Sequence, residues 1–364
     1  MEGFRAITRR NCTFIGSITI SSGLTEIVKY AFHGCCNLET VVIPETVTKI
    51  GPGAFAWSGL KSITLPDGIT EIGEKAFFNC RNLENIVIPK TVTKIGPLAF
   101  ADSGLKSITL LDGWLTEIGK YAFYGCSNLE SVVIPETVTK IGTEAFAHSG
   151  LKTINLPDGQ LTEIGEKAFY GCCNLETVVI PDSVTKIGPD VFAWSGLKSI
   201  TLPHGLTEIG EDAFYTCRNL ENIVIPDSVT KIGPDAFAFN GLKSIILPDG
   251  RLTEIGEGTF NGCNNLETVI IPSSVTKIGP DAFAFSGLKL IILPDGLTEI
   301  RNSAFYGCNK LESVVIPETV TKIGPYVFAK STLKSITLPS RLTKIGENAF
   351  QDCNNLVIKY RNQP

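Results

Sequence analysis

Cysteine is the residue of greatest chemical interest in this sequence. The chain has eleven cysteines, and eight of them lie three residues after a phenylalanine. Regularly spaced cysteines can bind a metal, form disulfides or act as nucleophiles, and each of these roles needs a second group at a fixed distance. The eight regular positions are Cys35, Cys80, Cys126, Cys172, Cys217, Cys263, Cys308 and Cys353.

The residues that would complete a catalytic or metal site are missing from the pattern. The three histidines, His33, His148 and His204, occupy three different positions relative to the phenylalanines, so no pair of ligands has metal-binding spacing. No glycine-rich phosphate loop follows a strand-like segment, and the carboxylates alternate with lysines instead of forming acid–base pairs. The sequence therefore predicts no enzyme, no metal and no cofactor.

An internal repeat sets the positions of these residues. Fifteen phenylalanines recur at intervals of 22 or 23 residues, which predicts about fifteen coils of a solenoid. Two coil types alternate, one reading T-E-I-G-x-x-A-F-x-x-C-x-N-L-E and the other T-K-I-G-P-x-A-F-A-x-S-G-L-K. The phenylalanines are Phe32, Phe55, Phe77, Phe100, Phe123, Phe146, Phe169, Phe192, Phe214, Phe237, Phe260, Phe283, Phe305, Phe328 and Phe350.

Each coil has the elements that would place these residues. Val41 and Ile43 follow a leucine at strand spacing and are predicted to point inward, and Pro44 ends the strand. A second, shorter strand is predicted over 47–50. Pro52 then suits the start of a short helical turn that carries Phe55 inward. We therefore predict an α/β solenoid with a parallel sheet, and a parallel β-helix is the alternative fold.

The repeat also determines the expected domain organisation. Residues 1–364 are predicted to form a single solenoid domain, with an N-terminal cap over 1–12, repeats over 13–358 and a tail over 359–364. Cysteines in every second coil would lie about 10 Å apart, whereas a disulfide needs Cα atoms within about 7 Å. The eight regular cysteines are therefore predicted to be small buried hydrophobic residues. Cys36 and Cys173 are adjacent extras, and Cys12 has no predicted place.

Composition and charge exclude several classes of partner. The chain is 43% hydrophobic with a net charge of −5, and it has no basic tract that would follow a phosphate backbone. The missing basic tract argues against nucleic-acid binding. No run of 18 apolar residues is present, so we expect no membrane insertion. No apolar segment follows Met1, so no signal peptide is predicted in this chain.

Alternating charges distinguish the two coil types. Glu39 and its equivalents alternate with Lys61 and its equivalents directly after the leucine, and a second ladder alternates Glu71 with Lys94. Coils stacked in register would place these opposite charges about 4.8 Å apart, so the ladders are predicted to favour one register. Lys344 breaks the second ladder in the last coil.

Two sets of positions are candidates for binding a protein partner. The first lies two residues after phenylalanine in the second coil type, where a variable residue stands in an otherwise uniform repeat. The second is the outward face of the strands, which becomes more apolar at Ile246, Ile270, Leu290 and Ile292. The alternatives are a loosely constrained surface position and ordinary strand-favouring residues. The variable column is Trp57, Asp102, His148, Trp194, Phe239, Phe285 and Lys330.

The pattern I-G-x-x-A-F-x-x-C-x-x-L-x-x-V-x-I-P, seen from Ile72 to Pro89, resembles the BspA-like leucine-rich repeats and recurs over residues 13–358. The resemblance implies a curved solenoid with the sheet on its concave face. It also implies a secreted or cell-surface protein that binds an extracellular-matrix or host surface protein, with no shared set of ligand residues. A cytoplasmic scaffold or delivered effector is the alternative, and the sequence leaves the oligomeric state open.

Overall fold

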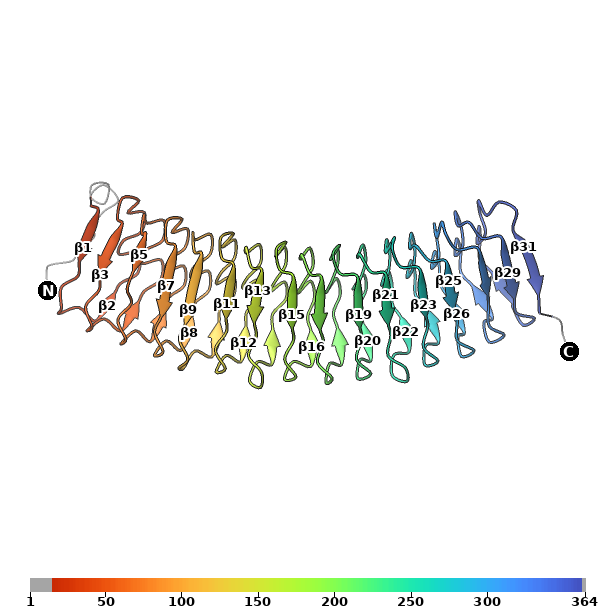
Figure 1. The fold of residues 1–364 in the computed structure, drawn as a ribbon, viewed down its shortest axis with the longest axis horizontal. Helices are drawn as coiled ribbons and strands as arrows, with labels where there is room; N and C mark the ends of the chain where they lie inside the picture. Colours follow the sequence, from red (N-terminus) through yellow and green to blue (C-terminus); the bar gives the residue numbers. More distant parts are fainter. Residues whose placement is uncertain (1–14, 362–364) are drawn as a thin grey trace. The chain divides into compact units, whose positions relative to one another are not determined.

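The computed structural model describes residues 15–361, and these residues form two compact units that divide between Ser183 and Val184. Each unit is a stack of coils in which long strands follow one another in one row and short strands in a second row (Figure 1). The predicted cap over 1–12 and Cys12 lie outside the described residues. That all coils form a single domain stays a prediction.

The first unit contains the long strands β1 (Ser17–Thr19), β3 (Thr40–Val42), β5 (Ser62–Ile63), β7 (Asn85–Ile88), β9 (Ser107–Leu110), β11 (Ser131–Val133), β13 (Thr153–Asn155) and β15 (Thr177–Val179). Its short strands are β2 (Glu26–Ile27), β4 (Lys49–Ile50), β6 (Glu71–Ile72), β8 (Lys94–Ile95), β10 (Glu117–Ile118), β12 (Lys140–Ile141) and β14 (Glu163–Ile164).

The second unit contains the long strands β17 (Ser199–Thr201), β19 (Asn222–Val224), β21 (Ser244–Ile246), β23 (Thr268–Ile270), β25 (Leu290–Ile292), β27 (Ser313–Val315), β29 (Ser335–Leu338) and β31 (Val357–Tyr360). Its short strands are β16 (Lys186–Ile187), β18 (Glu208–Ile209), β20 (Lys231–Ile232), β22 (Glu254–Ile255), β24 (Lys277–Ile278), β26 (Glu299–Ile300), β28 (Lys322–Ile323) and β30 (Lys344–Ile345).

Strands of successive coils pair in parallel and in register, as the repeat predicts. Thr40 of β3 lies opposite Ser62 of β5, and Lys49 of β4 lies opposite Glu71 of β6. Side chains alternate along each long strand, so Val41 is buried while Thr40 and Val42 are exposed. The prediction of a parallel solenoid is confirmed, and the predicted position of the sheet on a concave face stays a prediction.

The phenylalanines form a buried file through each unit. Within the units, successive rings lie 5.1–5.9 Å apart between centroids and are nearly parallel. Phe350 of the last coil is half-buried, and the others are buried. Because one coil cannot cover its own phenylalanine, the core exists only where coils stack.

The predicted helical turn is wrong, because no helix occurs among residues 15–361. In the segment that carries Phe55, the amides of Ala54 and Ala56 donate to carbonyl groups three residues earlier. The amides that alternate with them, those of Gly53 and Phe55, donate instead to carbonyl groups of the next coil. Since every second amide donates to a carbonyl group outside the segment, the i to i−4 hydrogen bonds of an α-helix cannot form. The solenoid is therefore closed by turns, not by helices.

The regular cysteines lie next to the phenylalanine file. The thiol of Cys126 donates to the carbonyl oxygen of Phe100 at 3.1 Å, and its Sγ lies 3.4 Å from Ser103 Oγ. Seven of the eight regular cysteines carry no disulfide, as predicted, and six of these seven are buried while Cys353 is half-buried. Cys35 is the exception, since it is disulfide-bonded. The spacing argument excluded only bonds between members of the column, so it could not exclude a partner elsewhere.

Both charge ladders are present. After the leucine, six lysines reach the glutamate of the preceding coil, as in the 2.7 Å pair of Lys61 with Glu39 and the 2.7 Å pair of Lys106 with Glu84. In the short strands, Glu208 accepts from Lys231 and Lys186, and these two ammonium groups lower the pKa of its carboxyl below the usual range. Such exposed pairs add little stability individually, but they favour one register.

Candidate functional site

The outward face of the long strands carries a run of exposed apolar side chains in the second unit. Ile246 is 62% exposed, Ile270 66% and Ile292 49%. Val224 lies opposite Ile246 in register, and Ile270 lies opposite Ile292. Exposed apolar patches of this kind often mark partner sites. We define the strand-face patch as Val224, Ile246, Ile270, Leu290, Ile292 and Val315.

The first unit shows why the patch is continuous only in the second. Its outward column also contains exposed valines, such as Val87 and Val133, but Thr109 separates them. In the second unit Ile246 and Ile292 occupy the positions that correspond to Thr109, and Leu290 replaces a serine. Because the polar residue on every second strand is replaced by isoleucine, this column is apolar on five successive long strands from Val224 to Val315.

A hollow of about 240 Å³ lies on the strand-face patch. Leu290, Ile292 and Val315 line it together with Asp295 and Arg361. Arg361 can donate to a carboxylate or a backbone carbonyl of a bound chain. The sequence had indicated Ile246, Leu290 and Ile292, but it gave no reason to include Arg361, which lies in the expected tail.

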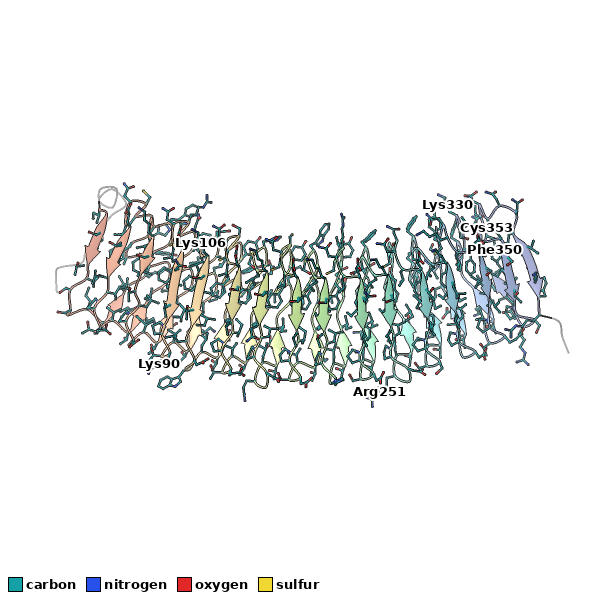
Figure 2. All side chains as sticks on the ribbon, in the orientation of Figure 1. Lys90, Lys106, Arg251, Lys330, Phe350 and Cys353 are labelled. Atoms are coloured by element: carbon teal, nitrogen blue, oxygen red, sulfur yellow. The ribbon has the colours of Figure 1, made fainter. Side chains whose placement is uncertain are left out.

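The variable column lies in the turns that follow each short strand, away from the strand face. All seven of its residues are exposed and adopt φ angles between 55° and 61°, and Lys330 is labelled in Figure 2. Several of these side chains lie over a glycine of the next coil. A Cβ on Gly171 would meet the ring of His148, and one on Gly307 would meet the ring of Phe285. These glycines therefore leave room for the column.

A second aromatic column, which sequence reasoning missed, packs against the variable one. Tyr124 and Tyr170 lie on either side of His148, with ring centroids 5.5 and 5.3 Å away. Tyr306 lies 5.3 Å from Phe285, and Lys330 Nζ lies 5.5 Å from the same tyrosine ring. Aromatic residues directly after phenylalanine in the first coil type were the available signal. The two columns pack against each other and leave part of each variable residue exposed.

The chemically reactive groups are dispersed. No cluster of three or more histidine, cysteine or acidic residues suited to a metal occurs among residues 15–361. Burial raises the pKa of the Cys126 thiol to about 12 and that of Cys80 to about 11. Because the thiolate is the nucleophile, these thiols are poorly reactive at neutral pH. The same stretch contains no helix able to span a bilayer.

We expect alkylation to distinguish the exposed cysteines from the buried ones. Iodoacetamide at pH 8 should modify Cys36 and Cys173, which are exposed, while Cys126 and Cys217 stay unmodified until guanidinium unfolds the chain. Raising the pH to 9 should not ionise these two buried thiols, since burial raises the pKa of Cys126 and that of Cys217 to about 12. Peptide mass spectrometry measures the modified sites, and rapid alkylation of Cys126 in the native protein would contradict its burial.

The family model described as a BspA type leucine-rich repeat region matches residues 8–115, 116–242 and 230–357. The chain belongs to the BspA-type leucine-rich repeat family. This confirms the resemblance on which the sequence analysis relied. The matched residues contain the long strands, short strands and turn segments described above. Leucine-rich repeat surfaces generally bind proteins and are typically non-catalytic.

Two solved structures are similar to this BspA-type chain. A leucine-rich repeat protein from Bacteroides ovatus is 29% identical, with a TM-score of 0.65, over 95% of this chain and 92% of that chain. A leucine-rich repeat protein from Eubacterium ventriosum is 27% identical, with a TM-score of 0.53, over 78% of this chain and 86% of that chain. No protein with a curated description matches the chain.

Proposed function

We propose that this BspA-type protein is a non-catalytic adhesion module whose strand-face patch binds an extended apolar segment of an extracellular-matrix or host surface protein. The observation that supports this most strongly is the unbroken outward run from Val224 to Val315, since isolated exposed residues need no explanation whereas a continuous patch does. Parallel strands spaced about 4.8 Å apart present these side chains as a flat ridge that an extended chain can cross.

The contacts of the patch indicate the chemistry of the partner. Ile246, Ile270 and Ile292 would bury apolar side chains, and burial of each large side chain contributes roughly 1.5–3 kcal/mol. Arg361, in the hollow beside Leu290, would bind a carbonyl or carboxylate of the same segment. A partner segment with alternating apolar residues and one acceptor group near its end fits both features.

Location at the cell surface is part of this proposal and rests on the family resemblance. An intracellular scaffold or delivered effector could use the same patch, so location separates the two functions. Antibody labelling of intact cells is expected to detect the protein. Labelling only after permeabilisation would favour the intracellular function and contradict adhesion.

Substitution on the patch tests the binding surface directly. Ile246→Glu/Ile270→Glu/Ile292→Glu is expected to weaken binding to immobilised fibronectin, laminin or collagen by more than about tenfold, because central apolar contacts dominate interface energy. The matched control is Val42→Glu/Val87→Glu/Val133→Glu, which changes the same face and charge in the first unit. Surface plasmon resonance measures both variants.

Equal loss in both triple variants, or no loss in either, would contradict the assignment of binding to the patch. A Trp57→Ala/Trp194→Ala variant tests the variable column in the same assay, and wild-type binding by this variant would exclude the two tryptophans as contacts. Absence of saturable binding to all three matrix proteins would contradict the adhesion role.

A further inference from the structure

The short-strand ladder of the first unit provides the reference for a local departure in the second. Lys94 pairs with Glu117 at 2.8 Å, and Lys140 pairs with Glu163 at 2.8 Å. Lys49 pairs with Glu71 at 3.4 Å in the same way. Each of these lysines has a glutamate on an adjacent strand, so the outward charges of this ladder neutralise one another.

Two residues in the second unit depart from the repeat and change this balance. Arg301 stands where the other coils from the second onward have glycine after the short strand, and Lys344 stands where its coil type has glutamate. The guanidinium of Arg301 pairs with Glu254 Oε1 through Nη1 and with Glu299 Oε2 through Nε, each at 3.4 Å. One new cation therefore engages both glutamates of this part of the ladder.

The ladder lysines beside these glutamates are left without acidic partners. Within residues 15–361, Lys277, Lys322 and Lys344 form no ion pair, although Lys322 lies opposite Glu299 on one side and opposite Lys344 on the other. Directly opposed like charges in a sheet are unfavourable. The ladder from Glu254 to Lys344 thus holds four cations against two carboxylates, unlike the neutralised pairs of the first unit.

A hollow of about 540 Å³ lies over this unbalanced stretch. Arg301, Lys322 and Lys344 line it, together with Glu299 and Glu347, so three cations face two carboxylates. Glu299 is already engaged by Arg301, which leaves the ammonium groups of Lys322 and Lys344 available to a ligand. We call this surface the basic hollow.

We propose that the basic hollow binds an acidic segment of a protein partner, with two carboxylates of the segment accepting from Lys322 and Lys344. The two lysines lie on adjacent strands about 4.8 Å apart, and alternate side chains of an extended peptide are separated by about 6.6 Å, which flexible lysines can span. A nucleic acid fits poorly, because Glu347 in the lining and a net charge of −5 oppose a long polyanion.

This inference rests on the proposed protein-binding function only for the kind of partner, since the hollow lies on the short-strand face and the strand-face patch on the long strands. A synthetic peptide of six glutamates, labelled with fluorescein, tests it without the natural partner. Lys322→Gln/Lys344→Gln is expected to weaken binding by about tenfold at low salt, measured by fluorescence anisotropy. The control is Lys94→Gln/Lys140→Gln, which removes the same charge at equivalent ladder positions and should leave binding within about twofold.

A second variant keeps the test independent of folding defects. Lys344→Glu restores the glutamate of the repeat and places it opposite Lys322, so it should preserve stability and still weaken peptide binding by about tenfold. Equal weakening by the control pair, unchanged binding by Lys344→Glu, or no binding by the wild type would overturn the proposal. Tighter binding of a single-stranded oligonucleotide, or full displacement of the peptide by millimolar phosphate at constant ionic strength, would overturn the assignment to an acidic protein segment. None of these results would affect binding at the strand-face patch, which is measured separately.

Discussion

Replacing Phe123 by alanine is expected to lower the free energy of unfolding by about 3–5 kcal/mol. The ring is fully buried between those of Phe100 and Phe146, whose centroids lie 5.4 Å and 5.1 Å from its own. Its removal leaves a cavity in a file that each coil shares with both neighbours. Because the coils depend on one another for their core, neither neighbour can close the gap without leaving its own register.

Urea unfolding followed by circular dichroism measures this effect. The control is Val133→Ala, at an exposed position on the strand face, which should change the free energy of unfolding by less than about 0.5 kcal/mol. If Phe123→Ala unfolded at the same urea concentration as the wild type, the phenylalanine file would not be the core that stabilises the stack.

Replacing Gly104 by alanine is expected to cost about 1–3 kcal/mol through steric overlap. A Cβ at this position would collide with the carbonyl oxygen of Arg81 in the preceding coil. Since Gly104 does not have a positive φ, an alanine could adopt its backbone conformation, so the cost arises from the close contact between coils and not from local strain.

Gly23→Ala is the matched control, because no atom of residues 15–361 lies within 4 Å of a Cβ built there. Thermal melts of the two variants should therefore differ, with a lower midpoint for Gly104→Ala alone. A shared midpoint would show that the coils are less tightly packed at Gly104 than described.

The coil and its core could be predicted from the sequence because the repeats act as an internal alignment. Equivalents of Val41, Phe55 and Cys126 recur at fixed places in the repeat. A position that stays apolar through many coils is expected to point into the core, and these positions are buried. Register was predictable for the same reason, since the alternation of Glu71 and Lys94 favours one pairing.

The turn segment and Cys35 could not be predicted in this way. Pro52 and Ala54 are compatible with a helix, and only the hydrogen bonds to the next coil, such as that from Phe55 to Ala76, exclude one. Those bonds depend on tertiary stacking, which local propensity does not encode. The disulfide of Cys35 depends on a residue outside its column, and spacing within the column gives no information about it.

The candidate surfaces were predicted in part. Exposure of Ile246 and Ile292 followed from strand alternation, and the variable column followed from comparing coils. The contacts of Tyr306 and the ion pairs of Arg301 required coordinates, because both depend on how long side chains reach across coils. Departures from an otherwise regular repeat, such as Arg301, are the sequence signal that could have directed attention to the basic hollow.

Footprinting tests most directly whether the strand-face patch is the binding surface. Hydroxyl-radical labelling of the protein, alone and saturated with fibronectin, laminin or collagen, reports which side chains the partner covers. We predict protection of Ile246, Ile270, Leu290 and Ile292, with unchanged labelling of Val87 and Val133 in the first unit. Protection confined to Trp57, Phe239 and Phe285, with the strand-face patch still labelled in the complex, would contradict this account.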